Sequence, residues 1–226
     1  MERSYRNLGY VLLVLLPIFV AGFWIPYFSE FPHFDETITT AVHVHFVSLF
    51  CFLLLLIVQP QPLAIRYRAF LTHRVLGKFS NILIPIALVS SVAMLWKEYH
   101  EHLTDGATVG MARNAEFLSA AQLLLFGALY AVSIAAIRRR AVATHMRCMI
   151  CIALVMLPAG MARVLGYLFH VRQAPSQTVC LALIDALLLT LIVFDRSRRL
   201  AARPYILVLL AYIVIEADWL TLGRPI

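Results

Sequence analysis

The sequence predicts an all-α integral membrane protein, a bundle of about seven transmembrane helices with its N-terminus in the cytoplasm and its C-terminus outside. Its composition excludes an ordinary soluble domain, because 62% of the 226 residues are hydrophobic, 14% are charged and the mean hydropathy is +0.85. The apolar residues form runs of roughly 20, the length a helix needs to cross about 30 Å of hydrocarbon. No long hydrophilic stretch divides the chain, so we expect one transmembrane domain, residues 1–226.

Polar segments separate seven apolar runs. The first run follows Arg3 and Arg6 but is too long for a signal-peptide core and has no convincing small-residue cleavage site before Trp24, so we expect a true span. Pro158 predicts a kink in the fifth run, since proline removes a backbone donor. The expected spans, with ends uncertain by a few residues, are 8–27, 38–59, 77–96, 116–137, 147–170, 177–195 and 203–220.

The basic residues predict the orientation, because cytoplasmic loops retain Lys and Arg. If seven helices alternate, most of the 19 Lys and Arg residues lie on the side of the N-terminus. The formal net charge of +7 is then explained by topology and by anionic lipid headgroups, so nucleic-acid binding is not needed. We expect the protein in a bacterial inner (cytoplasmic) membrane. The basic residues on the cytoplasmic side are Arg3, Arg6, Arg66, Arg68, Arg74, Lys78, Arg138, Arg139, Arg140, Arg147, Arg196, Arg198, Arg199 and Arg203.

Two histidines at the predicted cytoplasmic side are candidate haem ligands. His73 begins the third span and His145 begins the fifth. Two imidazoles at the same end of two helices can bind one iron from opposite faces, as in b-type haem sites of helical bundles. Arg74, Lys78 and Arg147 could neutralise the haem propionates. The alternative is that both histidines are interfacial residues in contact with lipid phosphate.

A second polar layer is expected slightly outward of the midplane. It consists of His45, Arg163 and Asp185, which fall within roughly 10 Å of the midplane at 1.5 Å per residue. An arginine at this depth needs a counter-charge, so an Arg163–Asp185 pair is expected, with His45 as a possible partner. The layer is either a buried ion pair that fixes helix packing or a site for a substrate, quinone or cofactor.

Signals for other chemistries are weak. Cys148 and Cys151 form a C-x-x-C on a membrane helix without a second pair, which fits helix packing better than metal or redox chemistry. The last span lacks the lysine that a retinal protein needs, and no nucleotide-binding, nucleophile-elbow or H-E-x-x-H motif is present. Hydrolytic and ATP-driven activities are therefore not expected.

Three motifs in order resemble a known family. His45, then the segment from His73 to Lys78, then His145 to Met149 with the downstream Arg163, resemble the pattern of the predicted membrane proteins grouped as DUF2306, over about residues 40–165. The resemblance implies a polytopic membrane protein and does not imply a reaction. The similarity to cytochrome b561-type bundles is looser, because those use four histidines on four consecutive helices and the fourth span here contains none.

Two hypotheses follow, with different chemistry. The first is a membrane electron-transfer protein or oxidoreductase, with haem b on His73 and His145 and a quinol near the second polar layer. The second is a non-catalytic subunit or assembly factor of a larger membrane complex, in which the polar layers only fix helix packing. A proton-relay transporter is a third possibility.

Overall fold

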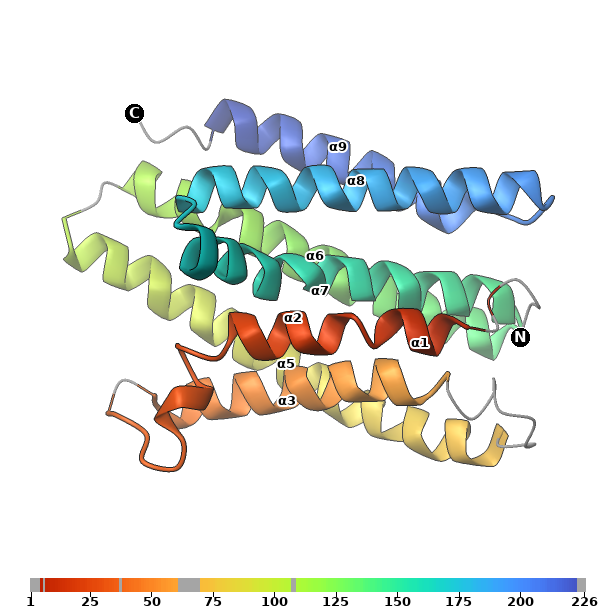
Figure 1. Ribbon diagram of the computed structural model, residues 1–226, viewed down its shortest axis with the longest axis horizontal. Helices are drawn as coiled ribbons and strands as arrows, with labels where there is room; N and C mark the ends of the chain where they lie inside the picture. The colour runs from red at the N-terminus through yellow and green to blue at the C-terminus, as the bar shows by residue number, and fades with distance from the viewer. Residues whose placement is uncertain (1–4, 6, 37, 61–69, 107–108, 223–226) are drawn as a thin grey trace. The chain divides into compact units, whose positions relative to one another are not determined.

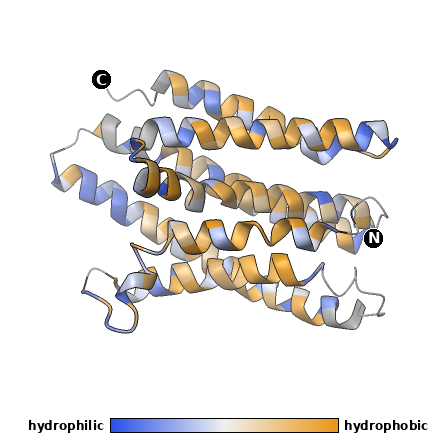
Figure 2. Ribbon diagram, in the orientation of Figure 1, coloured by the Kyte–Doolittle hydropathy of each residue, from blue (hydrophilic) through white to orange (hydrophobic). Residues whose placement is uncertain are grey.

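The computed structural model describes residues 5, 7–36, 38–60, 70–106 and 109–222, and all regular secondary structure in these residues is helical (Figure 1). Apolar residues dominate the helices, and polar residues gather at many of their ends (Figure 2). The elements are α1 (Leu8–Leu12), α2 (Leu15–Gly22), the 3-10 helix η2 (Phe28–Glu30), α3 (Thr40–Val58), α5 (Phe70–Thr104), α6 (Val109–Arg138), α7 (Val142–Phe169), α8 (Gln173–Ser197) and α9 (Arg203–Leu222).

Among the described residues, six helices are long and apolar enough to cross a membrane, which confirms the expected all-helical fold and fits an integral membrane protein. Their apolar segments are Thr40–Val58, His73–Thr104, Glu116–Arg138, Val142–Phe169, Pro175–Ser197 and Arg203–Thr221. The first expected span is different, since its apolar helix covers only Leu8–Gly22 and divides into α1 and α2. At 1.5 Å per residue this helix is about 22 Å long, shorter than the hydrocarbon thickness of about 30 Å.

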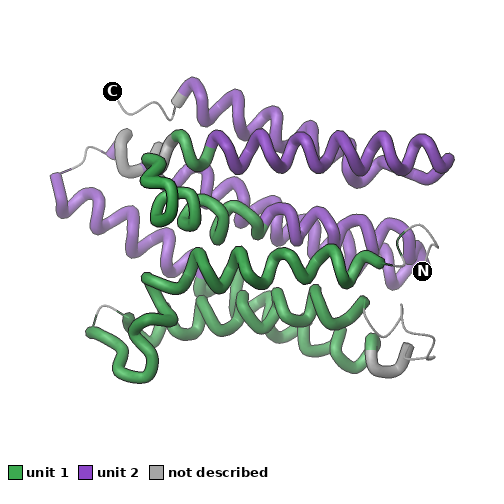
Figure 3. The backbone as a smooth tube through the Cα atoms, viewed as in Figure 1, with its two compact units in different colours: residues 1–90, 156–177 green, residues 91–155, 178–226 purple. Residues whose placement is uncertain are grey.

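The chain divides into two compact units (Figure 3), which we describe separately. Unit 1 comprises residues 1–90 and 156–177, and unit 2 comprises residues 91–155 and 178–226. In unit 1, α1 packs against α3, and in unit 2, α6 packs against α9. The boundary between the units crosses α5, α7 and α8, so each of these helices contributes to both.

Two glycines let α2 approach the second part of α7 inside unit 1. A methyl group on Gly22 would lie 2.8 Å from the Cα of Gly160, and one on Gly160 would lie 3.1 Å from the carbonyl oxygen of Ile18. Both distances are too short for a side chain to fit without moving the backbones. Small residues are common where membrane helices pack closely, because van der Waals contact replaces the hydrophobic effect there. This contact fixes α2 on α7 although α2 is short.

Aromatic rings hold the segment after α2 against α3. The ring of Tyr27 stacks on Phe46 with 3.8 Å between centroids, and Phe34 meets His43 at 4.6 Å. The Tyr27 hydroxyl also lies 2.8 Å from Nδ1 of His43. Burial raises the pKa of the Tyr27 phenol, so the phenol stays protonated and donates to Nδ1. His43 therefore has a structural role in unit 1, where it helps to hold this segment against α3.

The glycine contact predicts a clear difference between two alanine substitutions. Gly22→Ala should destabilise the protein by about 1–3 kcal/mol, because the new methyl group must displace the α7 backbone. Gly77→Ala is the matched control, since Gly77 lies in a helix with nothing within 4 Å of an added Cβ, and alanine favours helix. Thermal unfolding of the purified protein in detergent measures both. Equal stability of the two variants would contradict the close contact.

Candidate functional site

His73 is anchored inside unit 1 by the end of a neighbouring helix. Its Nδ1 lies 3.3 Å from the carbonyl oxygen of Gln59, the residue that follows α3. A carbonyl only accepts, so Nδ1 carries the proton and the lone pair is on Nε2. The bond also satisfies a carbonyl at a helix end, where no intrahelical partner exists. The contact therefore fixes both the tautomer of His73 and the junction of α3 with α5.

His145 is held in the same manner inside unit 2. Its Nδ1 lies 2.7 Å from Oγ and 3.3 Å from the carbonyl oxygen of Ser133 on α6, a residue without solvent exposure. The ring donates to this carbonyl only when Nδ1 carries the proton, and the lone pair is then on Nε2. Metal-ligating histidines commonly bond a carbonyl through the nitrogen that does not bind the metal. His73 and His145 share this feature, and each has it within its own unit.

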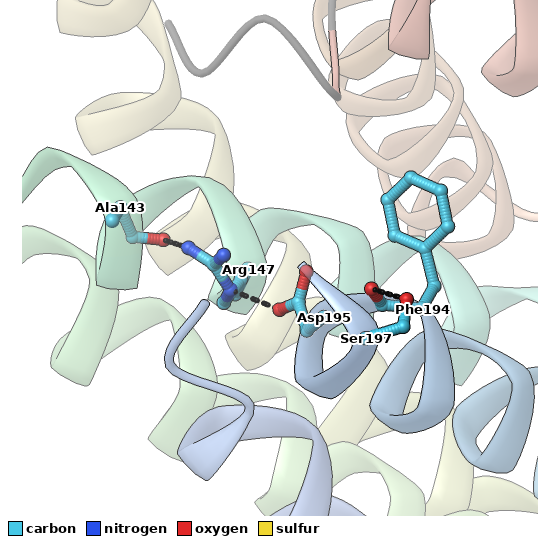
Figure 4. Close-up of polar contacts among 5 residues, drawn as sticks. All are labelled: Ala143, Arg147, Phe194, Asp195 and Ser197. Atoms are coloured by element: carbon cyan, nitrogen blue, oxygen red, sulfur yellow. Dashed lines mark hydrogen bonds and ion pairs between the residues drawn. The ribbon is translucent and has the colours of Figure 1, made fainter. Parts of the chain in front are cut away.

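Arg147 has a different partner from the one suggested by the sequence. Its Nε donates to Oδ2 of Asp195 on α8 at 2.6 Å, and its Nη1 donates to the carbonyl oxygen of Ala143 at 3.1 Å (Figure 4). Arg147 is 1% exposed and Asp195 is 0% exposed. A buried ion pair of this kind joins α7 to α8 and compensates the charge of both groups. The guanidinium of Arg147 therefore has its partners, Asp195 and Ala143, within unit 2.

The other residues considered for haem propionates are on the surface. Arg74 and Lys78 lie one turn apart in the first part of α5, and both are exposed. Long exposed cations near a helix end commonly reach the lipid headgroups. Their position is therefore consistent with both lipid contact and propionate binding.

The second polar layer predicted from the sequence is divided between the units. In unit 1, the guanidinium of Arg163 lies 4.5 Å above the ring of Phe23 and donates to the carbonyl oxygen of Ala159. His45 is half-buried and lies close enough to Arg163 to interact with it electrostatically. Asp185 belongs to unit 2, so its pairing with Arg163 stays a prediction from the sequence.

Asp185 has an interaction in unit 2 that the sequence analysis missed. Its carboxyl group is within hydrogen-bonding range of the carboxyl group of Glu216 on α9. The hydroxyl of Tyr212, one turn before Glu216, is close enough to both carboxyls to interact with them electrostatically. A search for carboxylates in the apolar segments would have found Glu216 in the last span. Only the fold shows that Glu216 faces Asp185.

Neither the described residues nor known proteins identify a cofactor. Within the part of the chain that the structure describes, no group of three or more His, Cys, Asp or Glu side chains could hold a metal ion. Among these side chains, Nε2 of His102 lies 3.2 Å from a carboxyl oxygen of Glu116. Comparisons with protein-family models, with curated proteins and with solved structures found no match.

The buried Arg147–Asp195 pair predicts a non-additive response to mutation. Arg147→Met or Asp195→Leu alone should destabilise the protein by about 3–5 kcal/mol, because each leaves one charge buried without its partner. The double variant should be less destabilised than the sum of the two. A double-mutant cycle on unfolding free energies in detergent measures the coupling.

An exposed pair supplies the control for this cycle. Lys97 and Glu101 are 3.4 Å apart on one face of α5, with side chains 42% and 57% exposed. Their coupling should be about 0.2–1 kcal/mol, since water screens exposed ion pairs. Additive effects at Arg147 and Asp195 would show that the buried pair does not stabilise unit 2.

Proposed function

We propose that this chain is an electron-transfer protein of the bacterial cytoplasmic membrane, with b-type haem bound through His73 and His145. The observation that carries the proposal is the anchoring of each imidazole through Nδ1 by a backbone carbonyl of its own unit. This arrangement puts the lone pair on Nε2 and restrains the ring, as an axial ligand requires. That both rings share one iron rests on the topology predicted from the sequence.

The residues fit this role in part. The tautomers of His73 and His145 suit bis-imidazole ligation, and haem held in this way supplies one-electron exchange. Arg74 and Lys78 are exposed and are the residues proposed to neutralise the propionates. Arg147 does not fit that task, because its guanidinium is buried against Asp195.

A quinol is the proposed redox partner on the outer side. Support comes from unit 1, where Arg163 lies against the ring of Phe23 and near His45. A guanidinium and an imidazole can donate hydrogen bonds to quinone oxygens. Asp185 stays a candidate for the same layer from its depth in the sequence. The alternative function is a non-catalytic subunit or assembly factor of a larger complex, and the spectra described below separate the two functions.

The haem proposal predicts a spectrum and its dependence on two residues. The purified full-length protein should show the bands of low-spin haem b in a dithionite-reduced-minus-oxidised difference spectrum. His73→Ala and His145→Ala should each abolish these bands and leave a folded protein, because each removes one axial ligand.

His43→Ala is the matched control for His73→Ala in unit 1. Its Nδ1 is bonded to Tyr27 and it lies toward the predicted outer side, so this variant should keep the spectrum. A folded, cofactor-replete preparation without haem bands would leave the non-catalytic subunit as the function. The same conclusion would follow if the low-spin spectrum survived unchanged in both His73→Ala and His145→Ala.

We further propose a cytoplasmic N-terminus and an external C-terminus, with Leu8–Gly22 as a seventh, short span. A reporter after Arg140 should be cytoplasmic and one after Asp105 should be translocated, because of the distribution of basic residues. These two sites give the same answer for six or seven spans. A label at the N-terminus distinguishes them, since it is cytoplasmic only if Leu8–Gly22 crosses the membrane, and an external label would therefore limit the bundle to six spans.

A further inference from the structure

Two carboxyl groups meet inside the apolar part of unit 2. Asp185 is near the middle of its span Pro175–Ser197, and Glu216 is about 6 Å from the middle of Arg203–Thr221 at 1.5 Å per residue. Their carboxyls lie within hydrogen-bonding range of each other. One oxygen of each, Oδ1 of Asp185 and Oε1 of Glu216, is sealed from solvent and has no hydrogen-bond partner within the described residues. Ionisable groups at this depth usually mark a functional site.

Tyr212 is an independent sign that these groups bind something. The side chain is fully buried, and its hydroxyl has no hydrogen-bond partner within the described part of the chain. Tyr212 and Glu216 are four residues apart on α9 and therefore lie on the same helix face. The hydroxyl interacts electrostatically with Asp185, Glu216 and Cys151 of α7. A buried hydroxyl without a partner is unfavourable, so its position beside the carboxyls calls for a ligand.

The chemistry of the pair restricts what this ligand can be. Two carboxylates this close repel each other strongly in low dielectric, so they cannot both be ionised without a compensating positive charge. Inside unit 2, Tyr212 interacts with both carboxyls, and its phenol carries no positive charge. A proton shared by the carboxyls removes the repulsion and gives the pair a hydrogen-bond donor.

We propose that Asp185 and Glu216 form a proton-binding site within the membrane, with one proton held between the two carboxyls and the Tyr212 hydroxyl completing the site. The site binds a proton by converting one carboxylate to a carboxylic acid, and it releases that proton when the pair is exposed to water. The proposal does not depend on haem, because none of these residues belongs to the proposed haem site. Its ligand is a proton, and its role is to accept or relay protons in the membrane.

A hydrophobic carbodiimide tests the site in the full-length protein. The reagent partitions into apolar surroundings and adds to protonated carboxyls, and the modified peptides are identified by mass spectrometry across a range of pH. Asp185 or Glu216 should be labelled, and the labelling should be lost as the pH rises. Asp195, on the same helix as Asp185, is the internal control, because its carboxyl group is engaged by the guanidinium of Arg147 and should not react.

Two variants distinguish a pair of interacting carboxyls from a single buried carboxyl that acts alone. In Asp185→Asn, the labelling of Glu216 should be lost at lower pH than in the natural protein, because the neighbouring carboxylate no longer disfavours ionisation. Asp185→Asn combined with Glu216→Gln should abolish labelling of the site, with the fold checked by thermal unfolding. Labelling of Asp195 as rapid as that of the pair, no labelling of either carboxyl in the folded protein, or an unchanged pH profile of Glu216 in Asp185→Asn would overturn the proposal.

Discussion

Hydrocarbon offers no hydrogen-bond partner, and this constraint determines both the helices and the polar contacts between them. Each backbone N–H and C=O inside the membrane must be satisfied within the protein, which a helix does along its own length. A polar side chain on that helix must find its partner on another helix or on the preceding turn. In unit 2 this requirement pairs Arg147 with Asp195 and His145 with Ser133. In unit 1 it directs Arg163 to the carbonyl of Ala159.

The helices could be predicted from the sequence because the length of each apolar run matches the thickness of the hydrocarbon that a helix must cross. The expected span 38–59 corresponds to α3 at Thr40–Val58, and 203–220 to α9 at Arg203–Leu222. The expected span 77–96 was shorter than α5, which runs from Phe70 to Thr104. Hydropathy shows where hydrocarbon begins, whereas exposed pairs such as Lys97–Glu101 support a helix in water. The break between α1 and α2 was not expected, although Pro17 in the first turn of α2 lacks the N–H that would bond the carbonyl of Leu13 and so favours a break at this place.

The residues of the candidate sites were predicted better than their partners. Depth in a span can be read from one sequence, and it marked Arg163 and Asp185 as groups that need compensation. The partner depends on the rotation of another helix, which a single sequence does not contain. Arg147 was assigned to haem because it lies next to His145, yet its side chain turns to Asp195 on α8. Asp195, at the end of the expected span 177–195, was not among the predicted partners.

The two aspartates of α8 show how the partner decides the chemistry of one residue type. Asp195 faces a guanidinium at 2.6 Å, so its charge is balanced and its position joins two helices. Asp185, ten residues earlier on the same helix, faces the carboxyl of Glu216 and the hydroxyl of Tyr212. An ion pair needs nothing further, whereas two carboxyls need a proton or another cation before they can lie side by side. A membrane protein that needed only stable packing could place an apolar residue at Glu216, because a buried polar pair is seldom more stable than its apolar replacement. The presence of Glu216 opposite Asp185 therefore argues for a role beyond packing in this part of unit 2.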